Sequence, residues 1–388
     1  MSQPPATSRS VVIIGGGISG TAAAYELARR GVSVTLLERG DLASMGSGWT
    51  LAGVRQSGRH PAELPLAQAA VRRWEHLSEE LDADVEYRQN GNLRLALTED
   101  DVPAIRQVVE DGNAAGIAMS YLPDIHTIHE VAPALTHHLA GASFCPTDGH
   151  ANPHLTVNAF AAAARRRGAT IRTGIEVQAL MTKGGTVTGV RTATGDLMTG
   201  TVIVAAGVYT PYLLDPLGIH ITFDTVQVPA VQTVAASPML QQVLGISTGG
   251  FAGRQEASGR FRLTGFSIPW NEPWHDPENV LPTMTQVQET ISWACRLIPA
   301  IRDVRMAQVW GGLIDKTPDA LPVIERTPDI DGLVVAAGFS GHGFCLGPVT
   351  GEILADLATE GRTAHPITPF ARQRLDTTGQ REAVSLHG

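Results

Sequence analysis

The sequence predicts an α/β protein: a discontinuous Rossmann-like domain that carries an inserted α+β domain built on an antiparallel β-sheet. Apolar runs that stop at glycine, the pattern of buried parallel strands, end near residues 14, 205 and 336. A helix pattern follows the first run, and residues 222–310 alternate short β runs with Pro, Gly and Trp. A single sheet built from three such distant strands requires a domain that is discontinuous in sequence.

Length and composition indicate a globular protein of two domains. The 388 residues are 43% hydrophobic and 17% charged, which suits well-packed cores. A net charge of −9 without a block of like charges argues against a nucleic-acid partner. No apolar run reaches the ~18 residues of a membrane span, and the polar leader Met1–Ser10 does not resemble a secretion signal, so we expect a cytoplasmic protein. The separated Cys145, Cys295 and Cys345 predict no disulfide framework and no metal site.

The first strand, Ser10–Ile14, leads into Gly15-Gly16-Gly17-Ile18-Ser19-Gly20 and a helix to Arg30, and a second strand ends at Glu38. This is the dinucleotide fingerprint GxGxxG in its proper context, with an acid 18 residues beyond the last glycine. Gly15 allows the tight turn, Gly17 the approach of a diphosphate, and Gly20 close packing of helix on sheet. Glu38 is expected to bind the ribose hydroxyls and to repel a 2′-phosphate.

The chain contains one such fingerprint and no second one. An enzyme that draws electrons from NAD(P)H usually needs a second nucleotide site, so the bound dinucleotide is expected to be redox-active itself. FAD fits best, and the first domain is therefore a Rossmann-like FAD-binding domain. The alternative is a glycine-rich turn in some other α/β protein.

The other elements follow in order. Ala43–Gly53 is predicted to be a Gly/Ser-rich loop, and Val85–Leu97 a β-hairpin around Asn90-Gly91. Helices are expected at 65–81, 100–115, 155–167, near 284–298 and at 348–360, and further strands at 170–173, around the turns at 184–185 and 195–196, at 201–206 and at 332–337. The predicted domains are 1–84, 146–221 and 322–388 for FAD, and 85–145 and 222–321 for the substrate.

Several residues are candidates for chemistry. The loop Gly338–Gly343 precedes the last helix, whose N-terminus could stabilise charge on a reduced flavin, with His342 beside it or simply bonded to backbone. Arg55 could bind a substrate carboxylate, or be a surface or phosphate-bound arginine. The aromatic residues Phe266, Trp270, Trp274 and Trp310 could wall a substrate cavity, or belong to the core.

Four segments together resemble a known family. They are the glycine fingerprint with Glu38-Arg39, the loop through Gly53, the run Thr317–Ile324 (TPDALPVI), and the run Ala336–Phe344 (AAGFSGHGF). The chain resembles the D-amino-acid oxidase (DAO) superfamily of FAD-dependent oxidoreductases, and within it glycine oxidase, the β subunit of sarcosine oxidase and related amino-acid dehydrogenases. The resemblance covers almost the whole chain.

The resemblance implies a reaction and a set of site residues. The α-C–H of an amino acid or secondary amine gives hydride to the flavin N5, and water hydrolyses the resulting imine. The implied catalytic residues are Arg55, His342, Phe266 and Trp310. The implied FAD-binding residues are Gly15, Gly17, Ile18, Ser19, Gly20, Glu38, Arg39, Ser47, Gly48, Thr50, Leu51, Val177, Ala206, Gly207, Gly312, Gly338, Ser340, Gly341, His342, Gly343 and Phe344.

Departures from these relatives refine the prediction. Thr50 and Gly312 stand where some relatives carry a histidine or cysteine bonded to FAD, so the FAD is expected to be non-covalent. Cys345 replaces a lysine that helps to hold the substrate carboxylate, which leaves amino-acid recognition open. Sarcosine-type oxidases use a lysine beside the flavin to react with oxygen, and this chain has only Lys183 and Lys316.

A dehydrogenase that passes electrons to a partner subunit is therefore slightly favoured over an oxidase. Two further alternatives remain: FAD-dependent oxidation of a 2-hydroxy acid, and a subunit of a heteromeric complex that holds FAD without catalysing the reaction itself.

Overall fold

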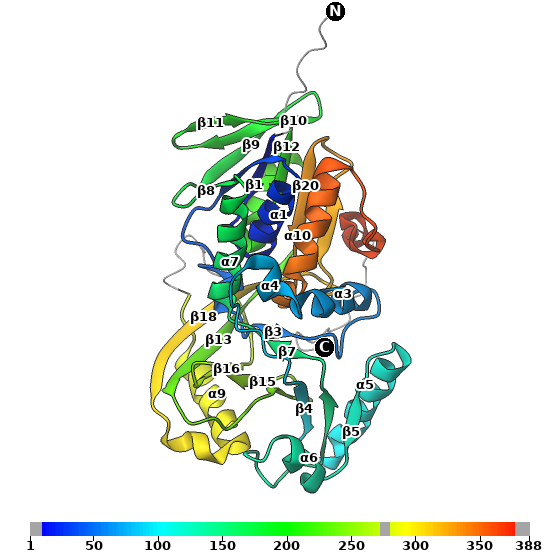
Figure 1. Ribbon diagram of the computed structural model, residues 1–388, viewed down its shortest axis with the longest axis vertical. Coiled ribbons are helices and arrows are strands. Elements are labelled where there is room, and N and C mark those ends of the chain that lie inside the picture. Colours follow the sequence, from blue (N-terminus) through cyan, green and yellow to red (C-terminus); the bar gives the residue numbers. More distant parts are fainter. Residues whose placement is uncertain (1–9, 272–279, 377–388) are drawn as a thin grey trace, which may run out of the picture.

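The computed structural model describes residues 10–271 and 280–376. The molecule is elongated, with a parallel sheet and its helices in the upper half of Figure 1 and a large, mostly antiparallel sheet in the lower half. Trp274, a candidate from the sequence, lies outside the described residues.

The upper sheet has six strands in the order β19-β20-β12-β1-β2-β8. Its parallel strands are β1 (Ser10–Ile14), β2 (Ser33–Leu37), β8 (Thr170–Arg172), β12 (Thr201–Val204) and β20 (Leu333–Ala337), and β19 (Val323–Arg326) is an antiparallel edge. The strands that end near residues 14, 205 and 336 are neighbours, as predicted. The Rossmann-like fold class is confirmed.

Two different layers cover the faces of this sheet. In β1, Val11 and Ile13 face one core while Val12 and Ile14 face the other, because successive strand side chains point to opposite sides. The first core is closed by the helices α1 (Ile18–Arg29), α7 (Pro153–Arg166) and α10 (Gly343–Thr359). The second is closed by a small antiparallel sheet of β9 (Val177–Lys183), β10 (Thr186–Thr192) and β11 (Gly195–Met198), and by α8 (Thr210–Leu214).

The lower sheet has nine strands, and β18 pairs with β13 at one side of it. They are β4 (Asn92–Ala96), β5 (Ser120–Leu122), β6 (Gly141–Cys145), β13 (Asp224–Ala235), β14 (Val243–Ile246), β15 (Phe251–Gln255), β16 (Arg260–Gly265), β17 (Ile268–Pro269) and β18 (Met306–Lys316). Helix α9 (Met284–Leu297) packs on one face through a core that includes Val231 and Leu263. Helices α5 (Val102–Ala114) and α6 (Ile125–Val131) flank the β4–β6 end (Figure 1).

Short elements join the two halves. They are α2 (Gly46–Trp49), α3 (Leu64–Trp74), α4 (Leu77–Leu81) and the pair β3 (Gly53–Val54) with β7 (Gly149–His150). Every strand of the six-stranded sheet falls within 1–84, 146–221 or 322–388, and every strand of the nine-stranded sheet within 85–145 or 222–321. The domain division itself remains a prediction that this distribution supports.

Three predicted elements differ in the structure. The 85–97 hairpin does not form: Arg88 bridges to His150 before the Asn90-Gly91 turn, and β4 after it pairs with β6 and β14, because better partners lie far along the chain. The helix expected from Pro348 begins at Gly343, so Pro348 lies inside α10. The helix expected at 65–81 is divided into α3 and α4.

Pro348 lacks the N–H that would continue the hydrogen bonding of α10. The indole N–H of Trp74 donates to the nearby carbonyl of Cys345 at 2.8 Å, and Arg73 donates to the carbonyl of Pro348 itself at 2.7 Å. Side chains of α3 therefore bind carbonyl groups in the part of α10 that the proline interrupts. Within 10–271 and 280–376, none of the helices has the length and apolar character needed to cross a membrane.

Candidate functional site

One large cavity runs between the two sheets, and about 370 Å³ of it is open to the centres of water-sized molecules. Its wall combines the ends of β1, β2 and β12, the 43–55 segment, the N-terminus of α10, and small residues of β13, β15, β16 and β18. The carboxyl ends of parallel strands in open α/β sheets are the usual place for a ligand.

The glycine fingerprint forms one end of this cavity. Gly15 has φ +114°, and a Cβ there would lie 2.3 Å from the carbonyl oxygen of Ala205 on the neighbouring strand. A Cβ on Gly20 would lie 2.0 Å from the carbonyl oxygen of Gly15, so α1 packs against the turn only because residue 20 is glycine. Gly17, the N-cap residue, has no side chain to cap α1, and the N-terminal residues Gly17, Ile18 and Ser19 line the cavity. This is the arrangement that binds a diphosphate.

Glu38 closes the turn from the end of β2. Its two carboxylate oxygens accept the backbone N–H of Gly16 at 2.6 Å and of Gly40 at 2.8 Å. Each carboxylate oxygen has a second lone pair, so hydrogen bonds from ribose hydroxyls remain compatible with this geometry. Beside it, the guanidinium of Arg39 stacks 3.7 Å above the ring of Tyr209 and donates to its hydroxyl. Both residues line the cavity.

The 43–53 segment crosses the cavity next to the fingerprint. The Ser47 hydroxyl accepts the N–H of Ile18 at 3.0 Å, in the first turn of α1. A Cβ on Gly48 would lie 1.9 Å from the carbonyl oxygen of Ala43, which explains the glycine. Trp49, Thr50 and Leu51 line the cavity beyond it.

The N-terminus of α10 forms the opposite wall with Gly341, His342, Gly343 and Phe344. His342 is buried, and its Nδ1 lies 3.0 Å from the buried carboxylate of Glu63. Burial and the nearby Arg59 lower the pKa of His342 to about 4. Burial alone would raise the pKa of Glu63, but His342 and Arg59 hold it at about 2. Near pH 7 the pair is a neutral imidazole that donates from Nδ1 to a carboxylate, so the alternative of a histidine bonded to backbone is not what the structure shows.

Three arginines converge on the same part of the wall: Arg55, Arg59 and Arg94. Burial, and then repulsion from the other two, lowers the pKa of Arg55. Burial and Arg59 lower the pKa of Arg94 to about 10. The carboxylates of Asp148 and Glu63 act in the other direction on the pKa of Arg55.

Asp148 holds the segment that carries two of these arginines. Its carboxylate accepts the N–H of Gln56 at 2.8 Å and the hydroxyl of Ser57. Arg55 donates to the carbonyl of Ser57 at 2.6 Å, and Arg59 donates back to the carbonyl of Arg55 at 3.2 Å. The segment is therefore held in one conformation.

Asp315, at the end of β18, is a second acidic group in the wall. It accepts the N–H of Gly338 at 2.7 Å. Burial raises its pKa to about 6, while that hydrogen bond acts in the other direction.

Most of the predicted site residues line this cavity together. The exceptions among the FAD candidates are Gly20, Gly48, Gly338 and Ser340, which support the wall from behind; Ser340, for example, accepts the N–H of Thr317 at 3.1 Å. Of the predicted catalytic residues, Arg55 and His342 line the cavity. Phe266 and Trp310 are not in its described lining, and Trp270 belongs to a small cluster with Val208 and Leu313. Their roles remain predictions.

The residues that line the cavity fit FAD. A glycine turn, the N-terminus of α1 and Glu38 suit the adenosine diphosphate part, and the cavity continues past Thr50 and Gly312 to the N-terminus of α10. The N-terminus of α10 suits the partial negative charge of a reduced flavin.

Sequence reasoning missed Arg59, Arg94, Tyr209 and Asp315. Arg94 carried a usable signal, because an arginine in the apolar run Asn92–Ala96 must have a polar environment when that strand is buried. The spacing of Arg59 and Glu63 from Arg55 was no guide, because residues 55–63 form no helix. Tyr209 and Asp315 gave no such signal.

Comparisons with known proteins agree with this geometry. A family model described as FAD dependent oxidoreductase (DAO) matches residues 10–357. The chain is 28% identical to the sarcosine oxidase subunit beta of Arthrobacter sp., over 96% of this chain and 92% of the relative. It is also 28% identical to the glycine oxidase of Bacillus subtilis (strain 168), over 89% and 92%. The crystal structure of L-proline dehydrogenase from P. horikoshii superposes with a TM-score of 0.88 at 29% identity, over 95% and 98%.

Proposed function

The chain belongs to the DAO family of FAD-dependent oxidoreductases, and from this premise we propose that it oxidises an amino acid or secondary amine that carries a carboxylate. The observation that carries the proposal is the arginine cluster of Arg55, Arg59 and Arg94 in the cavity wall. Guanidinium groups bind carboxylates in a bidentate manner, so three of them in one part of the cavity wall suit a substrate that carries a carboxylate. The relatives named above act on glycine, sarcosine and proline, which are compounds of this class.

The chain's own residues account for binding and orientation. Arg55 holds the carboxylate, and the Asp148 hydrogen bonds keep Arg55 in place. The wall opposite is made of small and apolar residues, including Ala230, Ala252 and Gly265, which leave room for the substrate and exclude water from it. FAD, when bound, supplies the two-electron acceptor for the C–H bond next to nitrogen. Burial and the nearby Arg59 keep His342 neutral beside the carboxylate site, so the substrate meets no additional cation there.

The proposal favours a dehydrogenase. Within the described part of the chain, neither Lys183 nor Lys316 is among the residues that line the cavity. An oxygen-activating lysine of the sarcosine oxidase kind is therefore not supported. Electrons would pass to a partner protein, in line with the subunit name of the Arthrobacter relative. Residence in the cytoplasm and non-covalent FAD are part of the same proposal.

The test is an anaerobic spectrum. The purified yellow protein is mixed with D- and L-amino acids, N-methylglycines, proline analogues and 2-hydroxy acids while flavin absorbance is followed. Bleaching by one amine class supports the proposal, and slow recovery in air supports the dehydrogenase. Bleaching by a hydroxy acid alone would refute the amine substrate, and fast recovery in air would make the protein an oxidase. Bleaching that requires an added partner would favour a FAD-holding subunit.

A further inference from the structure

The nine-stranded sheet turns two kinds of side chain toward the FAD-binding half. Nearest the cavity lie the small residues Ala252, Thr264 and Gly312. Two positions further along β15, β16 and β18, on the same face because side chains alternate along a strand, lie Arg254, Arg262 and Trp310. The small residues leave space for ligands. Arg254, Arg262 and Trp310 carry hydrogen-bond donors and therefore need acceptors outside the sheet.

They meet the backbone of the loop that crosses the cavity. Arg262 Nη1 donates to the carbonyls of Gly48 at 3.1 Å and Thr50 at 2.9 Å. Trp310 Nε1 donates to the carbonyl of Trp49 at 3.3 Å, and Arg254 Nε donates to the carbonyl of Leu51. Four consecutive carbonyl oxygens, from residue 48 to residue 51, are thus bound by side chains of the other sheet.

Two buried arginines side by side are unfavourable for the stability of a sheet. Arg254 and Arg262 are 1% and 7% exposed, and they are directly opposite each other in the β15–β16 register. Like charges in directly opposed positions destabilise an antiparallel pair, and a buried guanidinium needs partners to replace water. A sheet that needed only to be stable would carry apolar residues at both positions.

Glu256 supplies the negative charge that offsets the repulsion between the two guanidinium groups. Its Oε1 lies 2.8 Å from Arg262 Nε and 3.6 Å from Arg254 Nη2, and Gln232 donates to its Oε2 at 3.0 Å. The rest of Arg254 donates to the carbonyl of Ala151 at 3.1 Å and to Nδ1 of His150 at 2.9 Å. One carboxylate therefore orients two guanidinium groups, and each of these binds the loop.

We propose that Arg254, Arg262 and Trp310, oriented by Glu256, are positioning residues that hold the Gly48–Leu51 segment in the conformation that receives FAD. The segment carries Trp49, Thr50 and Leu51 in the cavity wall, and it follows Ser47, which binds the first turn of α1. Side chains of the nine-stranded sheet thereby fix the shape of part of the FAD site. The inference depends on FAD as cofactor and not on the proposed amine substrate.

The experiment compares Trp310→Phe and Arg262→Lys with the parent. Trp310→Phe keeps an aromatic side chain, though a smaller one, and deletes one hydrogen bond, and Arg262→Lys keeps the charge but loses the planar group that binds two carbonyls. Controls are Trp293→Phe and Arg296→Gln on α9, which belong to neither the cavity nor the loop contacts. The readouts are the FAD dissociation constant and hydrogen exchange of the peptide that covers residues 46–52.

The loss of one neutral hydrogen bond should raise the FAD dissociation constant ~3-fold for Trp310→Phe, and the loss of two hydrogen bonds from a charged donor should raise it ~10-fold or more for Arg262→Lys. Exchange in 46–52 should accelerate by similar factors, and both controls should remain within ~2-fold of the parent. Because Trp310 is only partly buried, Trp310→Phe tests the proposal even where Arg262→Lys fails to fold.

A fall in melting temperature with parental FAD affinity and parental exchange in 46–52 would overturn the proposal, since these side chains would then only stabilise the sheet. Failure of every amine to bleach the flavin would count against the proposed function. It would not affect the inference about the Gly48–Leu51 segment, which is tested by FAD affinity and hydrogen exchange.

Discussion

Arg55 illustrates how the environment of a single residue decides its chemistry. The sequence offers 27 arginines, and nothing local separates Arg55 from the others. In the structure it lines the cavity beside Arg59 and Arg94, where burial and mutual repulsion lower its pKa. A cluster of this kind is stabilised when an anion binds, because the anion offsets both the repulsion and the lost hydration.

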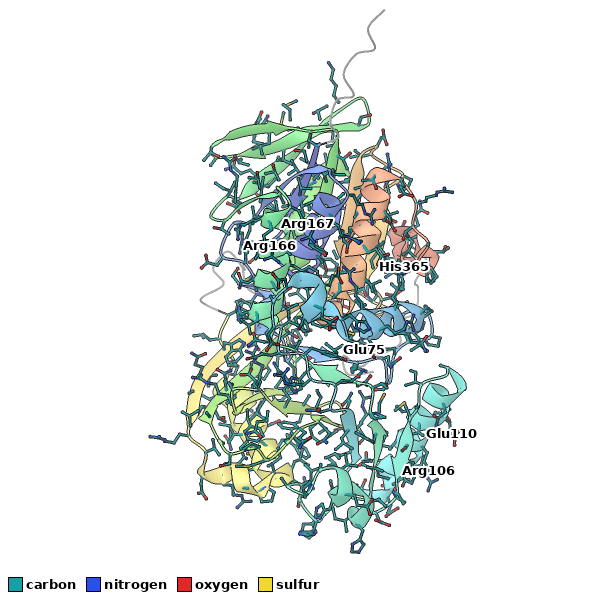
Figure 2. The ribbon with its side chains drawn as sticks, in the orientation of Figure 1. Glu75, Arg106, Glu110, Arg166, Arg167 and His365 are labelled. Atoms are coloured by element: carbon teal, nitrogen blue, oxygen red, sulfur yellow. The ribbon has the colours of Figure 1, made fainter. Side chains whose placement is uncertain are left out.

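Replacement of Arg55 by lysine should therefore weaken substrate binding. We expect Arg55→Lys to lower kcat/KM at least ~30-fold, mainly through KM, because lysine cannot make the bidentate contact. Steady-state kinetics with an artificial electron acceptor measures it. Arg106→Lys on α5, at the outer edge of the molecule (Figure 2), is the matched control and should remain within ~2-fold. A parental kcat/KM in Arg55→Lys would remove Arg55 from the carboxylate site.

Asp315 links pH to stability. Its pKa of about 6 in the folded protein lies above the ordinary 3.8, so the folded state holds this proton more tightly than the unfolded state does. The carboxyl therefore favours folding at low pH, and this contribution is lost as pH rises from about 3.8 through 6.

Asp315→Asn removes this pH-dependent loss of stability, and the amide oxygen of asparagine can still accept the N–H of Gly338. In FAD-free protein, the free energy of unfolding of the variant relative to the parent should increase by about 2.4 kcal/mol between pH 4 and pH 8. Urea denaturation at the two pH values measures it, with Asp196→Asn on the exposed β10–β11 hairpin as a surface control. A difference between parent and variant that does not change with pH would show that Asp315 titrates normally.

At the scale of elements, the contact between α1 and α10 determines the shape of the FAD site. Both helices direct their N-termini into the cavity, and they pack closely because α10 carries glycine at the contact. A Cβ on Gly351 would lie 2.4 Å from the Cβ of Ala22 and 2.8 Å from the backbone N of Ala23. A Cβ on Gly347 would lie within 2.5 Å of the Ile18 side chain. The glycines of α10 are therefore packing residues.

Gly351→Ala should push the two helices apart. The expected loss in the free energy of unfolding is about 2 kcal/mol, the usual range for an extra methyl group in a packed core, accompanied by weaker FAD binding. Gly200→Ala is the control, because a Cβ there meets no atom within 4 Å, and it should change stability by less than about 0.5 kcal/mol. Urea unfolding and a FAD titration give both values. An unchanged free energy of unfolding for Gly351→Ala would mean that α10 shifts at no cost.

At the scale of the whole molecule, FAD connects the two halves, so its binding should stabilise the entire chain. At a free FAD concentration 100 times the dissociation constant, the free energy of unfolding should rise by about 2.7 kcal/mol. FMN lacks the adenosine half that Gly15, Gly17 and Glu38 are placed to hold, so the same concentration of FMN should stabilise much less. Thermal unfolding with each nucleotide tests this. Equal stabilisation by FMN would show that the adenosine end contributes little.

The sequence alone determined those features of the protein that depend on constraints within a few neighbouring residues. The glycine fingerprint, Glu38 and the strands that end at glycine could be identified because each needs a special backbone geometry or a characteristic periodicity within a few residues. From these followed the Rossmann-like sheet, the FAD and the family, all of which are confirmed. Of the predicted fingerprint residues, Gly15, Gly17, Ile18 and Ser19 line the cavity, and Gly20 supports the turn from behind.

Only the tertiary structure decided which distant side chains meet. Arg94 on β4 joins Arg55 and Arg59, and Arg254 and Arg262 reach a loop more than 200 positions earlier. The start of α10 at Gly343, despite Pro348, also depends on contacts with α3. Such contacts are set by strand register and by the packing of one sheet against another. A polar side chain in an apolar strand predicts that a partner exists, but its identity depends on the whole fold.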